Sequence, residues 1–401
     1  MDATRYIVAG RLIDGSGGQV RRRVFLAVSG GIITAIAPLS ALPTHAAPTT
    51  VTDLSHCTLL PALVDCSVSL CRSPSVDRSL RTALDRADDD ARLAMLERHV
   101  LYCHSYGVLG VADHDDDADL AARYRAGSER AIEIRSSGTP CRSRQDCDRE
   151  RPGEREYLRV VLSGDIGDED DTLPFPDRAE LQHILAHRRG RTVVAVANGR
   201  RQVALALAAG CDAVEQGYRM GEANLREMAR RQVVWIPCAI RARNGLDSAT
   251  GDGGVACRFS QRYISPEKAA PGAEAFWKET LADQLRQLGL ARKLGVRTAV
   301  GTGAGSVGIL HGESMVEEMK LFLRAGYSLE ETVRSASEHG ARLFGMDSLG
   351  MLAAGRRATF LAVRGTVRQL PRKLSYLEGI YINGMPSSLY HKDPAGIRTT
   401  P

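Results

Sequence analysis

Short apolar runs alternate with longer amphipathic stretches through the middle of the chain. The runs have the length and the β-branched content of buried strands, whereas the longer stretches have the spacing of helices with one apolar face. The strand candidates are residues 62–70, 106–113, 157–164, 191–199, 212–217, 233–238 and 296–303. Alternating strands and helices indicate a parallel sheet with crossover helices, and the number of units suits an eightfold barrel. We therefore predict an α/β fold whose main domain, residues 61–345, is a (βα)8 TIM barrel.

Both ends of the chain have the pattern of short strands joined by tight turns. Residues 23–38 contain two apolar runs separated by a Gly-Gly pair, which is typical of a β-hairpin. Residues 358–365 and 378–387 are strand–turn units of the same kind. We predict that residues 1–60 and 346–401 combine into one small composite β-sandwich domain.

The composition is that of an ordinary globular protein, with 43% hydrophobic and 25% charged residues and a net charge of +5. Basic and acidic residues are mixed along the chain, so we expect no nucleic-acid partner. No stretch has the ~18 uncharged apolar residues of a membrane span, and the N-terminus lacks the pattern of a signal peptide. Nine cysteines are scattered without a CxxC pair, so we expect reduced thiols in a cytoplasmic protein without a membrane partner.

Several motifs follow one another in an order that resembles a known family. They are residues 11–18 (RLIDGSGG), 58–70 (TLLPALVDCSVSL), 106–113 (YGVLGVAD), 207–217 (LAAGCDAVEQG), 295–305 (GVRTAVGTGAG) and 335–363. Together they resemble the amidohydrolase superfamily, and within it the imidazolonepropionase-like branch. The resemblance implies a metal-binding βα barrel beside a small β-sandwich made from both termini. It also implies one or two divalent metals at the barrel mouth, which acidify a water molecule and polarise the scissile carbonyl.

The resemblance assigns metal ligands to six positions, and each position carries another residue type here. Two serines replace the His-x-His pair of the first strand, an arginine replaces the bridging lysine, valine and glutamine replace two histidines, and glycine replaces the aspartate of Gly-Thr-Asp. In chain order these positions are Ser67, Ser69, Arg159, Val196, Gln216 and Gly303. Valine and glycine offer no side-chain ligand, serine and glutamine are weak ligands, and arginine repels a cation. We therefore predict a vestigial pocket without metal, cofactor or catalytic residues.

Arg159 suggests what replaces the metal. Its guanidinium carries the positive charge that the mouth has lost, and its donors would seek Ser67, Ser69 and Gln216 as acceptors. We expect Arg159 to be a structural plug that points into the barrel. A bolder alternative is that Arg159 binds an anionic ligand, although the sequence places no second basic residue beside it.

Other reactive side chains have both a functional and a structural explanation. His311 follows the last strand, where it is either a remnant of substrate binding or a surface loop residue. Cys238 ends a strand at the mouth as a candidate nucleophile, but a small buried apolar residue is the alternative. The run from Asp113 to Asp119 is either a solvated loop or a weak cation site. An acyl-transfer role for Ser67 would need a nearby base, and we expect no His or Lys on the inner face.

These observations leave three functional hypotheses. The first is a catalytically degenerate protein, a pseudoenzyme, that acts as a non-catalytic or regulatory subunit of an active metal-dependent amidohydrolase. Its expected partner is such a paralogue, or a second copy of the chain. The second is a divergent or metal-independent hydrolase of non-peptide C–N bonds, or a lyase, that uses Cys238, His311 or the acidic run. The third is an anion-binding module that uses Arg159.

Overall fold

The structure is a computed structural model of the 401-residue chain. It describes residues 4–43, 50–116, 119–127, 131–143, 145–146, 155–164, 166, 176–250 and 272–390, with the backbone only for residues 247–250.

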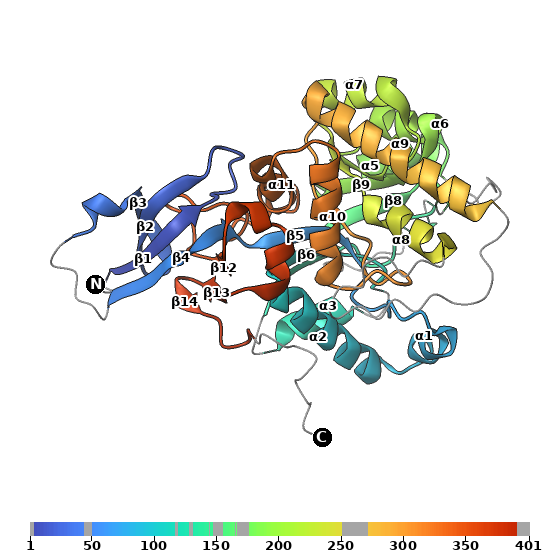
Figure 1. Cartoon of the computed structure of the whole chain (residues 1–401). Helices are drawn as coiled ribbons and strands as arrows, with labels where there is room; N and C mark the ends of the chain where they lie inside the picture. Colours follow the sequence, from blue (N-terminus) through green and yellow to red (C-terminus); the bar gives the residue numbers. More distant parts are fainter. Residues whose placement is uncertain are drawn as a thin grey trace.

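Strands from both ends of the chain form one seven-stranded sheet beside the barrel (Figure 1). Its strand order is β14 (Met385–Pro386), β13 (Gly379–Ile382), β12 (Phe360–Arg364), β4 (Val51–Pro61), β1 (Arg5–Leu12), β2 (Arg21–Ser29) and β3 (Ile32–Pro38). Only β1 and β4 pair in parallel; the other neighbours are antiparallel. Ile7, Leu26, Leu59 and Phe360 meet in its apolar core. The composite β domain built from both termini is therefore confirmed.

The barrel strands form two parallel sheets. One consists of β5 (Leu63–Val68), β6 (Val108–Asp113) and β7 (Glu133–Ser136), and the other of β8 (Tyr157–Val161), β9 (Thr192–Ala197), β10 (Ala213–Gln216) and β11 (Val234–Ile236).

Backbone hydrogen bonds close these two sheets into a barrel. Between β7 and β8, Glu156 N donates to Ser136 O at 2.8 Å. On the other side, residues 298–304 take the place of the eighth strand. Ala299 N donates to Trp235 O at 2.8 Å, and Cys66 N donates to Val300 O at 2.9 Å. The predicted α/β TIM-barrel architecture is confirmed.

Helices surround the barrel (Figure 1). They are α1 (Arg78–Asp85), α2 (Asp89–Ser105), α3 (Leu120–Ala126), α5 (Arg178–Ala186), α6 (Gly199–Ala209), α7 (Gly221–Arg231), α8 (Ala239–Thr250), α9 (Ala273–Leu294), α10 (Glu313–Arg324), α11 (Leu329–Ser335) and α12 (Glu338–Leu343). The helical pattern after β5 is divided into α1 and α2, because the Asp88 carboxylate accepts from Ala91 N at 2.9 Å and begins a new helix.

Two further observations bear on the expectations from composition. Among the described helices, none combines the length and the apolar character needed to cross a bilayer. Six described cysteines form no disulfide, whereas Cys141 is disulfide-bonded and its partner lies outside the described residues. The expectation that all the thiols are reduced is therefore wrong at Cys141.

Candidate functional site

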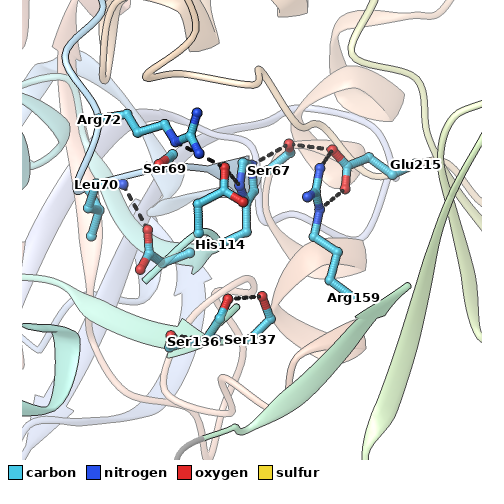
Figure 2. A network of polar contacts seen from close by, with 12 residues as sticks. Ser67, Ser69, Leu70, Arg72, His114, Ser136, Ser137, Arg159 and Glu215 are labelled. Carbon is cyan, nitrogen blue, oxygen red and sulfur yellow. Dashed lines mark hydrogen bonds and ion pairs between the residues drawn. The ribbon is translucent and has the colours of Figure 1, made fainter. Parts of the chain in front are cut away.

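A buried ion pair lies across the inner face of the barrel mouth. Arg159 of β8 donates from Nε to Glu215 Oε2 at 2.9 Å and from Nη2 to Oε1 at 3.0 Å. Glu215 belongs to β10, so the pair spans the intervening strand β9. The two side chains are only 8% and 2% exposed. Figure 2 shows that the Ser67 hydroxyl joins them, donating to Glu215 Oε1 at 2.8 Å.

Glu215 is the acceptor that the sequence prediction missed. We expected Arg159 to point into the barrel, as it does, but to bind Ser67, Ser69 and Gln216. Gln216 instead accepts from Asn198 Nδ2 at 2.7 Å. The alternation of strand 213–216 contains the missing signal, because Ala213 packs in the barrel interior and Glu215 follows it by two residues. A positive φ of 72° at Gln216 then ends the regular strand and breaks the alternation there.

The two partners hold each other in the ionised form. Burial alone would raise the pKa of Glu215, but the Arg159 guanidinium and the Ser67 hydroxyl outweigh it and lower this pKa to about 2. Burial would likewise lower the pKa of Arg159, but Glu215 raises it. A bidentate, doubly charged hydrogen-bonded pair of this kind is among the stronger side-chain interactions.

His114 lies beside this pair, which corrects the expectation that no His or Lys faces the barrel interior. Its Nε2 is 3.5 Å from Ser67 Oγ, and its Nδ1 is 3.2 Å from Asp115 Oδ2. The sequence signal was its position directly after β6, since strand ends converge at the mouth of a barrel. The arrangement resembles a serine–histidine–carboxylate series, but the Ser67 hydroxyl hydrogen is directed to Glu215. Ser67 is also not among the described residues that line the mouth cavity.

Gly303 leaves room for a second arginine. A Cβ atom at this position would lie 3.3 Å from Arg241 Cδ and 3.6 Å from Arg241 Nη1. Gly303 has a φ of 71°, which favours glycine, and its N donates to Ser67 O at 2.8 Å. The preceding Thr302 donates from N and Oγ1 to the buried carboxylate of Asp65, at 2.9 and 2.6 Å. The stem of Arg241 thus passes over the position that the family resemblance assigns to an aspartate.

The mouth forms a cavity of about 600 Å³ that is rich in arginine. The described charged residues that line it are Arg72, Arg81, Arg142, Arg159, Arg241, Asp85 and Asp115, with His114 beside them. Ser69, Val196 and Gln216 also line it, so four of the six assigned positions meet here. Five arginines face two aspartates, so among the described lining residues positive charge predominates.

The sequence profile of the amidohydrolase family matches residues 175–385. The chain belongs to the amidohydrolase family. A search of curated proteins gives no match.

Solved structures with the same fold cover nearly the whole chain. A Xaa-Pro dipeptidase with methionine bound in its active site is 18% identical, with a TM-score of 0.77, covering 96% of this chain and 100% of that one. The ochratoxinase of A. niger is 17% identical, with a TM-score of 0.77 and coverages of 96% and 95%. Molinate hydrolase is 15% identical, with a TM-score of 0.77 and coverages of 100% and 97%. At these identities the likeness shows the fold.

The mouth residues do not fit the metal centre that the amidohydrolase family implies. Both carboxylate oxygens of Glu215 are bound by Arg159, and Oε1 also by Ser67. At position 303 there is no side chain, and Arg241 lies over the backbone there. Within the described part of the chain, no group of three or more His, Cys, Asp or Glu side chains is arranged to hold a metal ion. A cation would have to displace the Arg159 guanidinium from the carboxylate that it binds with two hydrogen bonds.

His311 lies beneath the mouth, not on the surface. It stacks on His99, with ring centroids 3.8 Å apart and an interplanar angle of 14°. His311 Nε2 donates to Ser69 O at 2.9 Å, and His99 Nδ1 donates to Leu70 O at 2.8 Å. Burial lowers the pKa of His99 to about 4 and that of His311 well below its usual value. Two neutral imidazoles therefore hold the backbone after β5, and the surface-loop alternative for His311 is wrong.

The remaining candidates are also engaged in the protein interior. Cys238 is fully buried, burial raises the pKa of its thiol well above the usual value, and it is not among the described residues that line the cavity. Asp113 accepts from Leu70 N at 2.8 Å, and Asp116 caps α3 by accepting from Leu120 N at 2.9 Å. Those two aspartates are buried, so the solvated-loop explanation of the acidic run is wrong for them, while residues 117 and 118 lie outside the described part.

Proposed function

We propose that this protein is an amidohydrolase-family member that has no metal centre and does not hydrolyse C–N bonds. The observation that supports this proposal best is the bidentate Arg159–Glu215 pair with Ser67 on the same carboxylate. Breaking a buried pair by removing one partner typically costs roughly 3–5 kcal/mol, and a metal that claimed Glu215 would strand Arg159 in the same way. Placement in the imidazolonepropionase-like branch remains a prediction.

Metal-independent hydrolysis is less well supported by the same geometry. A serine nucleophile needs a base that accepts its proton, but the Ser67 proton is donated to a carboxylate whose pKa is about 2. The Cys238 thiol is buried and its pKa is raised, so little thiolate forms at neutral pH. Neither side chain is prepared for attack on an amide.

The biological role that we propose is that of a non-catalytic or regulatory subunit. A chain that keeps the whole fold of active hydrolases, with a mouth unsuited to their metals, can still present the surfaces through which such proteins associate. The proposed partner is an active metal-dependent relative or a second copy of this chain.

Metal content and turnover test the absence of hydrolysis. The full chain is purified after growth with added zinc, manganese or iron, its metal content is measured, and it is assayed on amide, lactam and ester substrates. We expect substoichiometric metal and no turnover above that of a buffer control. One or two metals per chain, with turnover that a chelator removes, would overturn the proposal.

Co-expression tests the partner separately. We expect an active, metal-containing relative to co-purify with the chain, with a stability or turnover that differs from that of the relative alone. A chain that elutes as a homo-oligomer in the presence of the relative would favour self-association, and a monomer that ignores it would remove the subunit role.

A further inference from the structure

We infer that the cavity at the barrel mouth binds a small organic molecule with at least two oxyanion groups, carboxylate or phosphate. This inference goes beyond the proposed function, because such a ligand would bind whether or not the protein hydrolyses anything. It rests on the charge, the arrangement and the shape of the described lining residues.

The first support is the balance of charge. Glu215 balances Arg159 in the floor of the cavity, and Asp115 Oδ2 lies 3.3 Å from Arg72 Nε. Arg81 and Arg142 then share the lining with one further described acid, Asp85, whose side chain is exposed. A partly enclosed cavity strengthens the attraction between these guanidinium groups and an anion, because the surrounding protein screens charge less than water does.

The second support is the arrangement of the arginines around the cavity. Arg72 follows β5, Arg81 lies on α1, Arg142 follows β7 and Arg241 lies on α8. One carboxylate can satisfy only one or two guanidinium groups through bidentate hydrogen bonds. Arginines that approach from several elements of the barrel mouth therefore favour a ligand with two or more anionic groups over a monoanion.

The third support is the relation between Arg241 and Gly303. The absent side chain at position 303 lets the stem of Arg241 lie against the barrel floor, with Nη1 3.6 Å from where a Cβ would be. The partly buried guanidinium of Arg241, beside the position that the resemblance assigns to an aspartate, gives that part of the mouth a positive charge. The chemistry that this mouth favours is therefore recognition of an anion by arginine.

The fourth support is the shape of the cavity. Its volume of about 600 Å³ lies within the roughly 300–1,000 Å³ of small-molecule sites. Val161, Val196, Ile309 and Trp277 supply apolar wall between the charged groups. Such walls suit the carbon skeleton of an organic ligand, and the arginines suit its ends.

Isothermal titration calorimetry of the full chain tests the inference at constant ionic strength. Succinate and 1,2-ethylenediphosphonate represent the carboxylate and the phosphate-like oxyanion pairs, acetate is the monoanion, and succinamide is the uncharged isostere of succinate. We expect saturable binding of succinate or 1,2-ethylenediphosphonate, weaker binding of acetate and none of succinamide. Whichever dianion binds identifies the kind of oxyanion.

Variants connect the binding to the arginines. Arg241→Gln and Arg142→Gln should each weaken binding of the dianion at least about tenfold, because each removes a charged hydrogen-bond donor. Arg226→Gln is the matched control, since Arg226 is exposed on α7 and pairs with Glu222 away from the cavity. It should leave the affinity unchanged. Circular dichroism verifies that each variant is folded. If Arg241→Gln is unfolded, the Arg142→Gln variant tests the inference, because Arg142 is exposed and its replacement should leave the fold intact.

The inference is overturned if neither dianion binds saturably, if succinamide binds as well as succinate, or if all three variants weaken binding equally. Metal content and turnover are measured on the same preparation. A metal-loaded, active preparation that still binds succinate through Arg142 would overturn the proposed function and leave this inference standing.

Discussion

The inside of the barrel has two layers that lie on the same strands and differ in chemistry. The lower layer is apolar, with Tyr157, Val194, Ala213 and Ile236 packed against Phe344 beyond α12. Two residues further along their strands, Arg159 and Glu215 belong to the polar upper layer, together with Ser67 and His114 (Figure 2). Residues two apart on a strand face the same side, so one set of strands supports both layers.

The two layers contribute to the stability of the barrel by different interactions, and the upper layer also contains the polar groups that face the mouth. The lower layer is stabilised by packing, which tolerates apolar exchange of similar volume. The upper layer depends on pairing of charges, which stabilises the fold only while both partners are present. Removing one charge of the Arg159–Glu215 pair should therefore destabilise the barrel, whereas removing both together should leave it intact.

The sharpest way to break the upper layer is Glu215→Ala. We expect the free energy of unfolding to fall by about 3–5 kcal/mol, because Arg159 would remain buried without its carboxylate. Urea denaturation followed by circular dichroism measures it. The double variant Arg159→Leu/Glu215→Leu should recover most of the loss, since it removes both charges. A loss below ~1 kcal/mol for Glu215→Ala would mean that the pair behaves like an exposed one.

Ile236→Ala breaks the lower layer instead. Ile236 is fully buried among the apolar interior residues, so the cavity left behind should cost about 2–5 kcal/mol of unfolding free energy. Val307→Ala is the matched control, because Val307 is 45% exposed and should change stability by less than ~0.5 kcal/mol. Equal effects of the two variants in urea denaturation would contradict the distinction between a packed lower layer and a solvated rim.

Acid titration separates the stacked histidines from the ion pair. The folded pKa of His99 is about 4, below its usual value of 6.5, so the unfolded state binds the proton first as the pH falls. His99 should therefore contribute a loss of roughly 1–3 kcal/mol between pH 6.5 and 4. The buried carboxyl groups of Asp65 and Glu318, whose pKa burial raises to about 7 and about 8, contribute in the opposite direction over this range. Glu215, with a folded pKa of about 2 against 4.5, contributes stability above pH 4.5 that is lost as the pH falls toward 2.

Denaturant midpoints measured at each pH test whether the contribution of His99 changes at a higher pH than that of Glu215. In His99→Asn, the amide nitrogen can still donate to Leu70 O but does not titrate, so the stability of this variant relative to the wild type should rise as the pH falls from 6.5 to 4. A constant difference between the two proteins over this range would mean that His99 contributes nothing to the pH dependence.

Ser67→Ala has the smallest expected effect. It removes one hydrogen bond to Glu215 and leaves Arg159 on the carboxylate, so we expect a loss of about 1–2 kcal/mol. Ser69→Ala is the matched control, since no hydrogen-bond partner of the buried Ser69 Oγ lies in the described part of the chain. In thermal unfolding, Ser67→Ala should lower the midpoint temperature more than Ser69→Ala does. The reverse order would mean that Ser69 contributes more to stability than Ser67.

The prediction of the fold depended on local periodicity, which a single sequence contains. Strand-length apolar runs such as 62–70 and 191–199 became β5 and β9, and the strand patterns at both ends became one sheet. The stretch from 80 to 107 was harder, because its helical pattern continues through the point where the Asp88 cap divides α1 from α2.

The prediction of the mouth succeeded for single positions and failed for their partners. Arg159 was identified as an inward-facing residue from the family resemblance, which assigns its position to a bridging lysine. Its carboxylate partner lies 56 residues away on β10, and His114 reaches Ser67 across 47 residues. Alternation along one strand indicates which way a side chain points, but it contains no information on which residue of another strand it meets.

The amino-acid sequence alone determined the class of fold and the composite β domain, because these follow from local patterns, and the family resemblance added the expectation that six metal-ligand positions carry other residue types. Only the tertiary structure decided that Glu215 pairs with Arg159, that Arg241 passes over Gly303, and that five arginines share one cavity. The physical reason is that pairing, burial and the pKa of Glu215 depend on distances between strands and loops far apart in the chain, which barrel closure alone sets.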